Sequence, residues 1–273
     1  MRIVTLLPSA TDIVLALGGE AALVGVSHSC TGASPLLPRL TSTRVNPAAP
    51  SAEIDAQVKD ASQPLYDLDV SRLERLAPDV VVSQSLCDVC AVASGDVEAA
   101  VRGIASRPTL VNLSPFRLAD VPVGFDEVGA AIDREREAAA LRSRWAAHFE
   151  ALQGRFADHA PRVAFLDWMD PPFAAGHWIP DLLQLLGCES VLAAPGEPSR
   201  EVDWDTVRAA RPDLILAACC GFDADRAYQD PVPPDIDVVR LDGDRFFSRP
   251  SPALMDAANQ LAVVLDRALR AAS

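Results

Sequence analysis

Cysteines and histidines that could bind a metal or perform thiol chemistry lie in loops that follow predicted strands. Cys87 and Cys90 form a C-x-x-C pair directly after an apolar run, and His28 and Cys30 lie in an earlier loop. Thiolates and imidazoles are donors that Zn, Fe and Co accept. The alternative is that Cys87 and Cys90 are small apolar side chains facing a core. The pattern therefore indicates either a transition-metal or thiol centre at Cys87 and Cys90, together with Cys30, or a buried turn.

A second group of candidate residues follows the strand predicted over residues 162–166. Trp168 and Trp178 flank a Pro-Pro turn, with Asp170 and His177 between them. Aromatic faces hold flat ligands, and a carboxylate or an imidazole can orient a polar edge. The competing interpretation is that Trp178 opens a helix and packs in the core while Asp170 is a cap. We expect this loop to form part of a ligand pocket.

Two further segments place aromatic and polar side chains at the ends of predicted elements. Cys220 and Phe222 follow the strand predicted over residues 213–217, and Phe247 and Arg249 precede the last helix. Two adjacent phenylalanines in an irregular segment cannot both face one core, so one is expected to line the cleft, with Arg249 available to an acidic group. The alternative is a hydrophobic staple with a surface arginine.

Composition excludes several classes of function. The chain has 273 residues, 49% of them hydrophobic, and a net charge of −14 with Lys59 as its single lysine. Such an acidic protein is not expected to bind nucleic acid. Because no apolar run reaches about 18 residues, no membrane insertion is predicted. The first residues enter a strand too soon for a signal peptide, which predicts a cytoplasmic location, or a periplasmic or cell-surface one if a leader was trimmed.

The elements that must position these residues form two similar halves. Apolar residues at helical spacing predict one uninterrupted helix over 120–159, between an N-terminal lobe (1–119) and a C-terminal lobe (160–273). The segment 69–82 aligns with the segment 203–216 as a helix, a Pro-Asp turn and a strand. The predicted fold is therefore α/β, with two Rossmann-like βαβ lobes, one long connecting helix, and a ligand cleft between the lobes where strand ends converge.

Local signals refine this prediction. Ser9 and Asp12 have the spacing of a capping box for the first helix, and Asp120 is placed to cap the long helix. The segment 28–64 is long for a connector and is predicted to be a functional flap with a helix near residues 52–59. No G-x-S-x-G, P-loop or Rossmann glycine fingerprint is present. No catalytic residue is therefore predicted.

The opening run Leu7–Gly18, the two Pro-Asp-strand units and the single spanning helix resemble the helical-backbone periplasmic binding proteins. These are the vitamin B12 and ferric-siderophore receptors of ABC importers. The runs 86–92, 168–172, 176–180 and 242–250 resemble a leaderless branch identified as cobalamin-binding proteins. The resemblance implies reversible, non-catalytic binding of a cobalamin-like corrinoid or related metal chelate. The alternatives are a cytoplasmic metal- or thiol-dependent enzyme or redox protein centred on Cys30, Cys87 and Cys90, and a haem or transition-metal carrier.

The same resemblance bears on the partner. Family members that dock onto an ABC permease carry an acidic residue on each lobe, seven positions before the Pro of the Pro-Asp unit. Here these positions are Ser71 and Asp205, with Glu74 three residues after Ser71. The resemblance therefore implies a small-molecule ligand, and a permease contact with one of its two acidic groups replaced.

Overall fold

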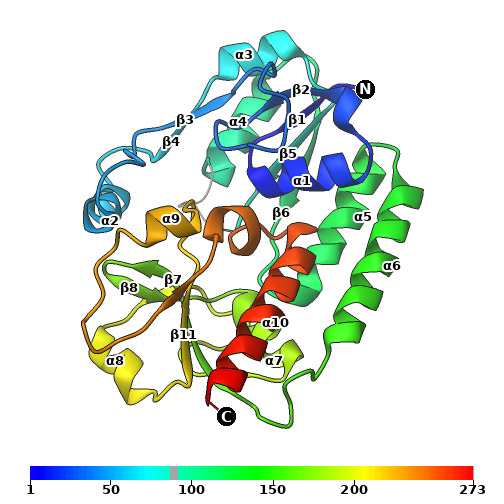
Figure 1. Cartoon of the computed structure of the whole chain (residues 1–273). Coiled ribbons are helices and arrows are strands. Elements are labelled where there is room, and N and C mark those ends of the chain that lie inside the picture. Colours follow the sequence, from blue (N-terminus) through cyan, green and yellow to red (C-terminus); the bar gives the residue numbers. More distant parts are fainter. Residues whose placement is uncertain (87–91, 273) are drawn as a thin grey trace. The chain divides into compact units, whose positions relative to one another are not determined.

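The computed structural model describes residues 1–86 and 92–272, which divide into two compact units (Figure 1). Unit 1 comprises residues 1–48, 56–115 and 119–144, and unit 2 comprises residues 49–55, 116–118 and 145–273. Each unit is a mixed α/β structure built on its own sheet. The predicted α/β fold class is confirmed.

Unit 1 is built on a parallel four-stranded sheet of order β2-β1-β5-β6. Strands β3 and β4 form a separate antiparallel pair. The elements up to the end of this sheet are β1 (Ile3–Thr5), α1 (Pro8–Ala16), η1 (Glu20–Ala22), β2 (Leu23–Val26), β3 (Thr41–Thr43), α2 (Ser51–Lys59), β4 (Tyr66–Leu68), α3 (Val70–Leu76), β5 (Val80–Gln84), α4 (Ser94–Gly103) and β6 (Thr109–Leu113). All five residues of β5 are buried, as expected for a central parallel strand covered on both faces.

The predicted helix over 120–159 is wrong in its extent. After η2 (Leu118–Asp120), the structure has two helices, α5 (Val121–Ala131) and α6 (Glu135–Leu152). Asp133 adopts a left-handed backbone conformation (φ 56°), and the Arg134 N–H donates a hydrogen bond to the Gly129 carbonyl at 2.8 Å. Arg142 on α6 pairs with Asp126 on α5 at 2.6 Å, so the two helices form an antiparallel hairpin. The apolar period breaks at Glu135 because the chain turns there.

The division between the units falls inside α6, between Arg144 and Trp145. The helix that passes from unit 1 into unit 2 is the 18-residue α6, and not one helix over the whole predicted segment 120–159. The chain leaves α6 through turns at residues 153–159, where Gly154 has a φ of 68°.

The capping box predicted at Ser9 is also wrong. Helix α1 begins at Pro8, with Leu7 at the N-cap and no side-chain capping bond, so Ser9 lies inside the first turn. Pro8 tolerates this position because the first helical N–H has no partner within the helix. Asp120 does occupy the N-cap of α5, without a capping bond from its side chain.

Unit 2 has a sheet of order β10-β8-β7-β11-β12, with β9 paired to the start of β7. Strands β7, β9, β11 and β12 run parallel, β8 is antiparallel to β7, and β10 is antiparallel to β8. Its elements are β7 (Arg162–Met169), β8 (Pro172–Ala174), α7 (Ile179–Leu186), β9 (Glu189–Ser190), β10 (Arg200–Glu201), α8 (Trp204–Ala209), β11 (Leu214–Ala217), α9 (Ala224–Ala227), β12 (Val239–Arg240), the π-helical turn η3 (Gly243–Phe247) and α10 (Ala253–Ala272).

The two units share a strand order and matched contacts, as the predicted internal duplication would require. The parallel order β9-β7-β11-β12 of unit 2 repeats β2-β1-β5-β6 of unit 1. Asp79 accepts a hydrogen bond from the Arg2 backbone N–H at 2.7 Å, and Asp213 accepts one from the Arg162 N–H at 2.8 Å. The aspartate of each Pro-Asp turn therefore binds the start of the equivalent strand, β1 in unit 1 and β7 in unit 2.

Within the described part of the chain, no helix is both long enough and apolar enough to cross a bilayer.

Candidate ligand-binding site

In unit 1, Cys30 follows β2 and is almost completely buried. Its side chain is 1% exposed, and its sulfur accepts a hydrogen bond from the Thr11 hydroxyl at 3.0 Å. The Ser27 hydroxyl lies 3.2 Å from the same sulfur, and Thr11 also bonds Thr5 at 2.7 Å. This network ties the loop after β2 to β1 and α1. The thiol of Cys30 thus has a structural role in this loop.

His28 lies two residues earlier and is held by different contacts. Its Nδ1 lies 2.7 Å from the Thr41 hydroxyl, and its ring packs 5.8 Å from the Tyr66 ring. Partial burial, and secondarily the charge of Arg39, lowers the pKa of His28 below its ordinary 6.5. A neutral imidazole is thereby favoured, which is the form that binds ligands or metals.

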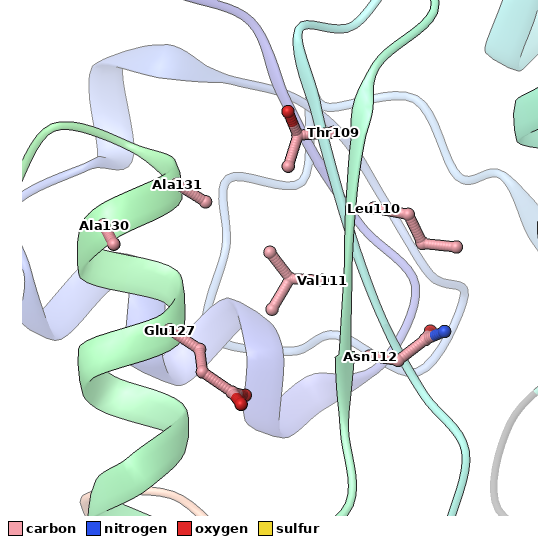
Figure 2. A pocket seen from close by; sticks show the side chains of 7 residues that line it. All are labelled: Thr109, Leu110, Val111, Asn112, Glu127, Ala130 and Ala131. Atoms are coloured by element: carbon pink, nitrogen blue, oxygen red, sulfur yellow. The ribbon is translucent and has the colours of Figure 1, made fainter.

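A depression of about 540 Å³ lies elsewhere in unit 1, between α5 and β6 (Figure 2). It is lined by residues 109–112 of β6 and by Glu127, Ala130 and Ala131 of α5. In Figure 2, the Val111 side chain points toward α5, whereas Leu110 points to the other face of the strand. None of the predicted site residues lines this depression.

In unit 2, two of the predicted ligand residues pack against each other with tilted rings. Trp168, near the end of β7, and Phe222, after β11, have ring centroids 4.8 Å apart. The guanidinium of Arg226 lies 4.2 Å from the Phe222 ring centroid. We call Trp168 and Phe222 the aromatic wall. The strand-end placement predicted for both residues is therefore observed, and the two side chains are brought together.

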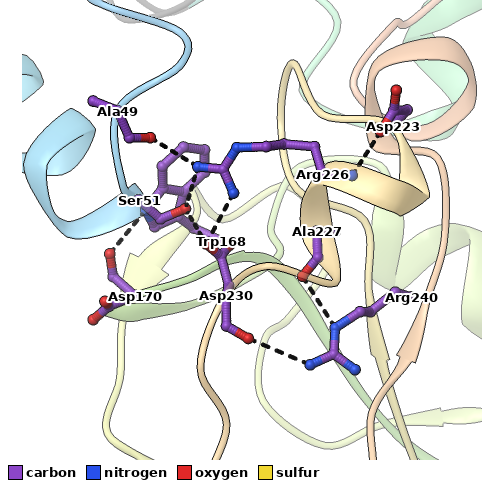
Figure 3. Close-up of polar contacts among 9 residues, drawn as sticks. All are labelled: Ala49, Ser51, Trp168, Asp170, Asp223, Arg226, Ala227, Asp230 and Arg240. Atoms are coloured by element: carbon purple, nitrogen blue, oxygen red, sulfur yellow. Dashed lines mark hydrogen bonds and ion pairs between the residues drawn. The ribbon is translucent and has the colours of Figure 1, made fainter.

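Asp170 lies in the turn between β7 and β8. Its backbone carbonyl accepts a hydrogen bond from the Trp168 indole N–H at 3.1 Å, which fixes the tilt of that ring (Figure 3). The residue is half-buried. Asp170 therefore orients Trp168 through its backbone.

His177 and Trp178 are adjacent in sequence and have different environments. His177 has a left-handed backbone (φ 53°), and its N–H donates to the Glu197 carbonyl at 2.6 Å. Its half-buried ring lies between those of Trp178 (5.7 Å) and Phe116 (6.2 Å), and burial lowers its pKa. Trp178 is 7% exposed, and its indole N–H donates to the Phe247 carbonyl at 3.0 Å.

Both of the adjacent phenylalanines are buried within unit 2, and the expectation that one of them lines the cleft stays a prediction. Phe246 is 8% exposed and Phe247 is 2% exposed. Both are covered because the segment is a π-helical turn, η3, which directs neighbouring side chains to different surroundings. Phe247 packs 5.3 Å from Phe165, and Arg245 covers Phe246 at 4.9 Å. Arg249 is also buried, at 7% exposure, and binds Asp244 at 2.8 Å.

The remaining cysteines differ in exposure. Cys188 and Cys219 are buried, and burial raises the pKa of Cys188 to about 12 and that of Cys219 higher still. Cys220 is exposed. Cys87 and Cys90, the predicted metal ligands, lie outside the described residues. Among the residues that are described, no three His, Cys, Asp or Glu side chains are grouped as a metal site would require.

Sequence reasoning missed the charged residues behind the aromatic wall. Arg226, besides covering Phe222, binds Asp230 at 3.2 Å and donates to the Ala49 carbonyl at 2.8 Å (Figure 3). Asp230 in turn accepts a hydrogen bond from the Ser51 hydroxyl at 2.5 Å. The i, i+4 spacing of Arg226 and Asp230 was a visible signal of a pair. The contact with Ser51, 179 residues away, had no sequence signal.

Comparison with known proteins identifies the family. The family model described as "Periplasmic binding protein" matches residues 3–232, so the chain belongs to the periplasmic binding protein family. A search of curated proteins finds no match.

Solved structures agree in fold over nearly the whole chain. The periplasmic vitamin B12 binding protein BtuF of Vibrio cholerae is 18% identical with a TM-score of 0.66, covering 98% of this chain and 97% of its own. The periplasmic heme binding protein HutB of Vibrio cholerae is 18% identical with a TM-score of 0.71, covering 97% and 98%. A possible iron-binding, periplasmic solute-binding protein of Staphylococcus epidermidis is 18% identical with a TM-score of 0.68, covering 95% and 96%.

Proposed function

We propose that this chain is a non-catalytic solute-binding protein of ABC-importer type whose ligand is a cobalamin-like corrinoid. The family assignment supports reversible binding of a small molecule. Structures of similar fold are described as binding vitamin B12, heme or iron. The aromatic wall supports a flat ligand, because the half-buried ring of Trp168, which rests on Phe222 at a strand end, offers an apolar contact.

The charge pattern of unit 2 distinguishes between flat ligands, and this is the observation on which the proposal depends. Arg226 is paired with Asp230, Arg249 with Asp244, and Arg117 with Asp181. A heme presents two carboxylates, which would compete with these acidic partners for the three guanidinium groups. The rim of a cobalamin carries neutral amides, which can donate to carboxylate and carbonyl oxygens. A neutral, amide-bearing chelate therefore fits unit 2 better than a dicarboxylate does.

Two other predicted ligand residues add polar groups to the proposed contact set in unit 2. Asp170 and His177 are half-buried there and supply a carboxylate and an imidazole. A ligand contact at His28 of unit 1 stays a prediction. The thiols of Cys30 and Cys220, the rings of Trp178 and Phe247, and a metal at Cys87 and Cys90 stay predictions. The enzyme and redox alternative gains no support from Cys30, whose sulfur is buried in a hydroxyl network.

Isothermal titration with hydroxocobalamin and with hemin tests the proposal. Wild-type protein should bind the cobalamin and bind hemin about tenfold more weakly, because the largely buried Arg226–Asp230 pair resists exchange of its partner. Trp168→Leu should weaken cobalamin binding about two- to tenfold, since an aromatic contact contributes roughly 0.5–1.5 kcal/mol beyond its area. Trp204→Leu on α8 is the matched control and should bind normally. Tighter binding of hemin than of cobalamin would contradict the ligand assignment.

Delivery to a permease forms part of the same proposal. Asp205 on α8 has a side chain 91% exposed and pairs with Arg208 at 2.7 Å, while Ser71 and Glu74 lie exposed on α3. Asp205→Arg should abolish ligand-stimulated ATPase activity of a reconstituted cognate importer, with cobalamin binding unchanged. Full stimulation by this variant would contradict docking through α8. Fractionation of cells that express the native gene decides the compartment.

A further inference from the structure

Residues Ala49–Asp55, which we call the strap, belong to unit 2 although the chain before and after them belongs to unit 1. The strap is well packed in unit 2: Ala49 is 4% exposed, Ser51 is 1% exposed and Ile54 is 6% exposed. Segments that leave their own unit need specific contacts, because ordering each residue costs about 1–2 kcal/mol of conformational entropy. The contacts that hold the strap should therefore be identifiable.

One buried carboxylate and one guanidinium supply these contacts (Figure 3). The Ser51 hydroxyl donates to Oδ1 of Asp230 at 2.5 Å, and Nη2 of Arg226 donates to the Ala49 carbonyl at 2.8 Å. Arg226 and Asp230 bind each other at 3.2 Å, with side chains 18% and 3% exposed. Both partners thus bind the strap and are themselves largely removed from water.

The guanidinium of Arg226 also contacts the aromatic wall. Arg226 lies 4.2 Å from the centre of the Phe222 ring, and Phe222 stacks on Trp168 at 4.8 Å. A continuous series of contacts therefore runs from Ser51 through Asp230, Arg226 and Phe222 to Trp168. Movement of Arg226 must disturb the strap and the wall together.

The Arg226–Asp230 ion pair depends on each group that hydrogen-bonds to it. Oδ2 of Asp230 is buried and accepts no hydrogen bond from any described residue, so Oδ1 alone receives the hydrogen bonds that offset burial of this carboxylate. A buried charge that loses a partner strongly destabilises its surroundings, because the remaining charge stays out of water. Removing the hydroxyl of Ser51 should therefore affect more than the strap.

We propose that Arg226 and Asp230 are positioning residues that couple docking of the strap to the rigidity of the aromatic wall. With the strap docked, Arg226 is fixed and holds Phe222 against Trp168. With the strap released, Arg226 loses the Ala49 carbonyl and the wall loses its support. The consequence for the ligand rests on the proposed function: a ligand that needs the rigid wall binds the strap-docked form and keeps the strap in place.

Hydrogen exchange of the ligand-free protein tests the coupling first. Asp230→Asn should make backbone amides of the strap exchange about ten to a hundred times faster, as expected for losing a charged buried hydrogen bond. The matched control is Asp235→Asn, which breaks the exposed Arg208–Asp235 pair of the same unit at 2.8 Å. This control should leave strap exchange unchanged. Strap exchange at the wild-type rate in Asp230→Asn would overturn the proposal.

Ser51→Ala is a milder change that keeps Arg226, Asp230 and both rings. With 5-fluorotryptophan incorporated, the ¹⁹F resonance of Trp168, assigned by its loss in Trp168→Phe, should shift or broaden in Ser51→Ala. The resonance of Trp145 on α6 should not change. An unshifted Trp168 resonance would show that the strap and the wall are independent and would overturn the coupling.

Hydroxocobalamin is the probe for the ligand-dependent step. Its addition should slow strap exchange in the wild type and should have a smaller effect in Arg226→Leu, which cannot bridge the strap and Phe222. Equal slowing in both proteins would overturn the ligand-dependent step. A failure of hydroxocobalamin to bind would contradict the proposed function, while the two experiments on ligand-free protein would still decide the coupling.

Discussion

Gly243 lies where η3 crosses the end of β11, and no side chain fits at this position. A Cβ there would lie 2.1 Å from the Cys219 carbonyl oxygen and 2.6 Å from the Ala218 carbonyl carbon, both of them backbone atoms. Hydrogen bonds hold the two segments at this distance: the Leu241 N–H donates to the Ala217 carbonyl at 2.7 Å, and the Asp244 N–H to the Phe222 carbonyl at 2.9 Å. Gly243→Ala should therefore push η3 away from the loop that carries Phe222.

The cost of Gly243→Ala follows from these distances. Ordinary contact begins near 3.4 Å, so the backbones must separate by about 1 Å, which weakens at least one of the two hydrogen bonds. Overpacking of this kind costs about 1–3 kcal/mol, and a lost hydrogen bond about 1 kcal/mol. The expected loss of unfolding free energy is about 3 kcal/mol. At roughly 2–4 °C per kcal/mol, the melting temperature of unit 2 should fall by about 6–12 °C.

Differential scanning calorimetry measures this shift. Gly103→Ala, at the end of α4, is the matched control, because a Cβ there meets nothing within 4 Å and the backbone is not left-handed. That variant should melt within about 2 °C of the wild type or slightly above it. A fall of less than about 2 °C for Gly243→Ala would refute the close approach of η3 to β11.

Further predictions concern titration, thiol reactivity and the turn before α6. Because the pKa values of His28 and His177 lie below 6.5, the unfolded chain binds more protons than the folded one as the pH falls through that value, and stability should drop there. Thermal melts between about pH 7.5 and 5 should show this loss of stability, and the loss should be smaller in His177→Gln. The same dependence of melting temperature on pH in both proteins would refute the lowered pKa of His177. Of the cysteines in the described segments, Cys220 should be alkylated first by iodoacetamide at about pH 8, with Cys188 and Cys219 protected by burial and raised pKa values; prior labelling of Cys219 in a peptide map would contradict this. Asp133→Gly should raise the melting temperature of unit 1, because glycine adopts the φ of 56° without strain. A lower melting temperature would contradict the left-handed conformation of residue 133.

The strands and the duplication were predictable because they depend on local chemistry. The residues of β5 form an apolar run after a Pro-Asp turn, which is typical of a buried parallel strand. The break between α5 and α6 was missed because residues 132–134 contain neither glycine nor proline, the usual signals of a turn. Asp133 adopts its left-handed conformation because packing of α5 on α6 requires the turn, and that packing is not visible in the local pattern.

The candidate site was predictable to the extent that strand ends determine it. Trp168 and Phe222 were placed after strands that are neighbours in the sheet, so their meeting follows from topology. The role of Ser51 could not be found in this way, because its partner Asp230 is distant in sequence and belongs to a different element. The burial of both Phe246 and Phe247 depends on the π-helical turn, which sequence periodicity does not predict.

The central claim is that the chain binds a neutral corrinoid reversibly, and equilibrium dialysis tests it most directly. Purified wild-type protein is dialysed against hydroxocobalamin and, separately, against hemin, and bound ligand is measured by visible absorption on each side of the membrane. We expect saturable retention of hydroxocobalamin at one ligand per chain, full release on dilution, and weaker retention of hemin. Retention of hemin alone, or no excess of cobalamin on the protein side, would contradict the assignment.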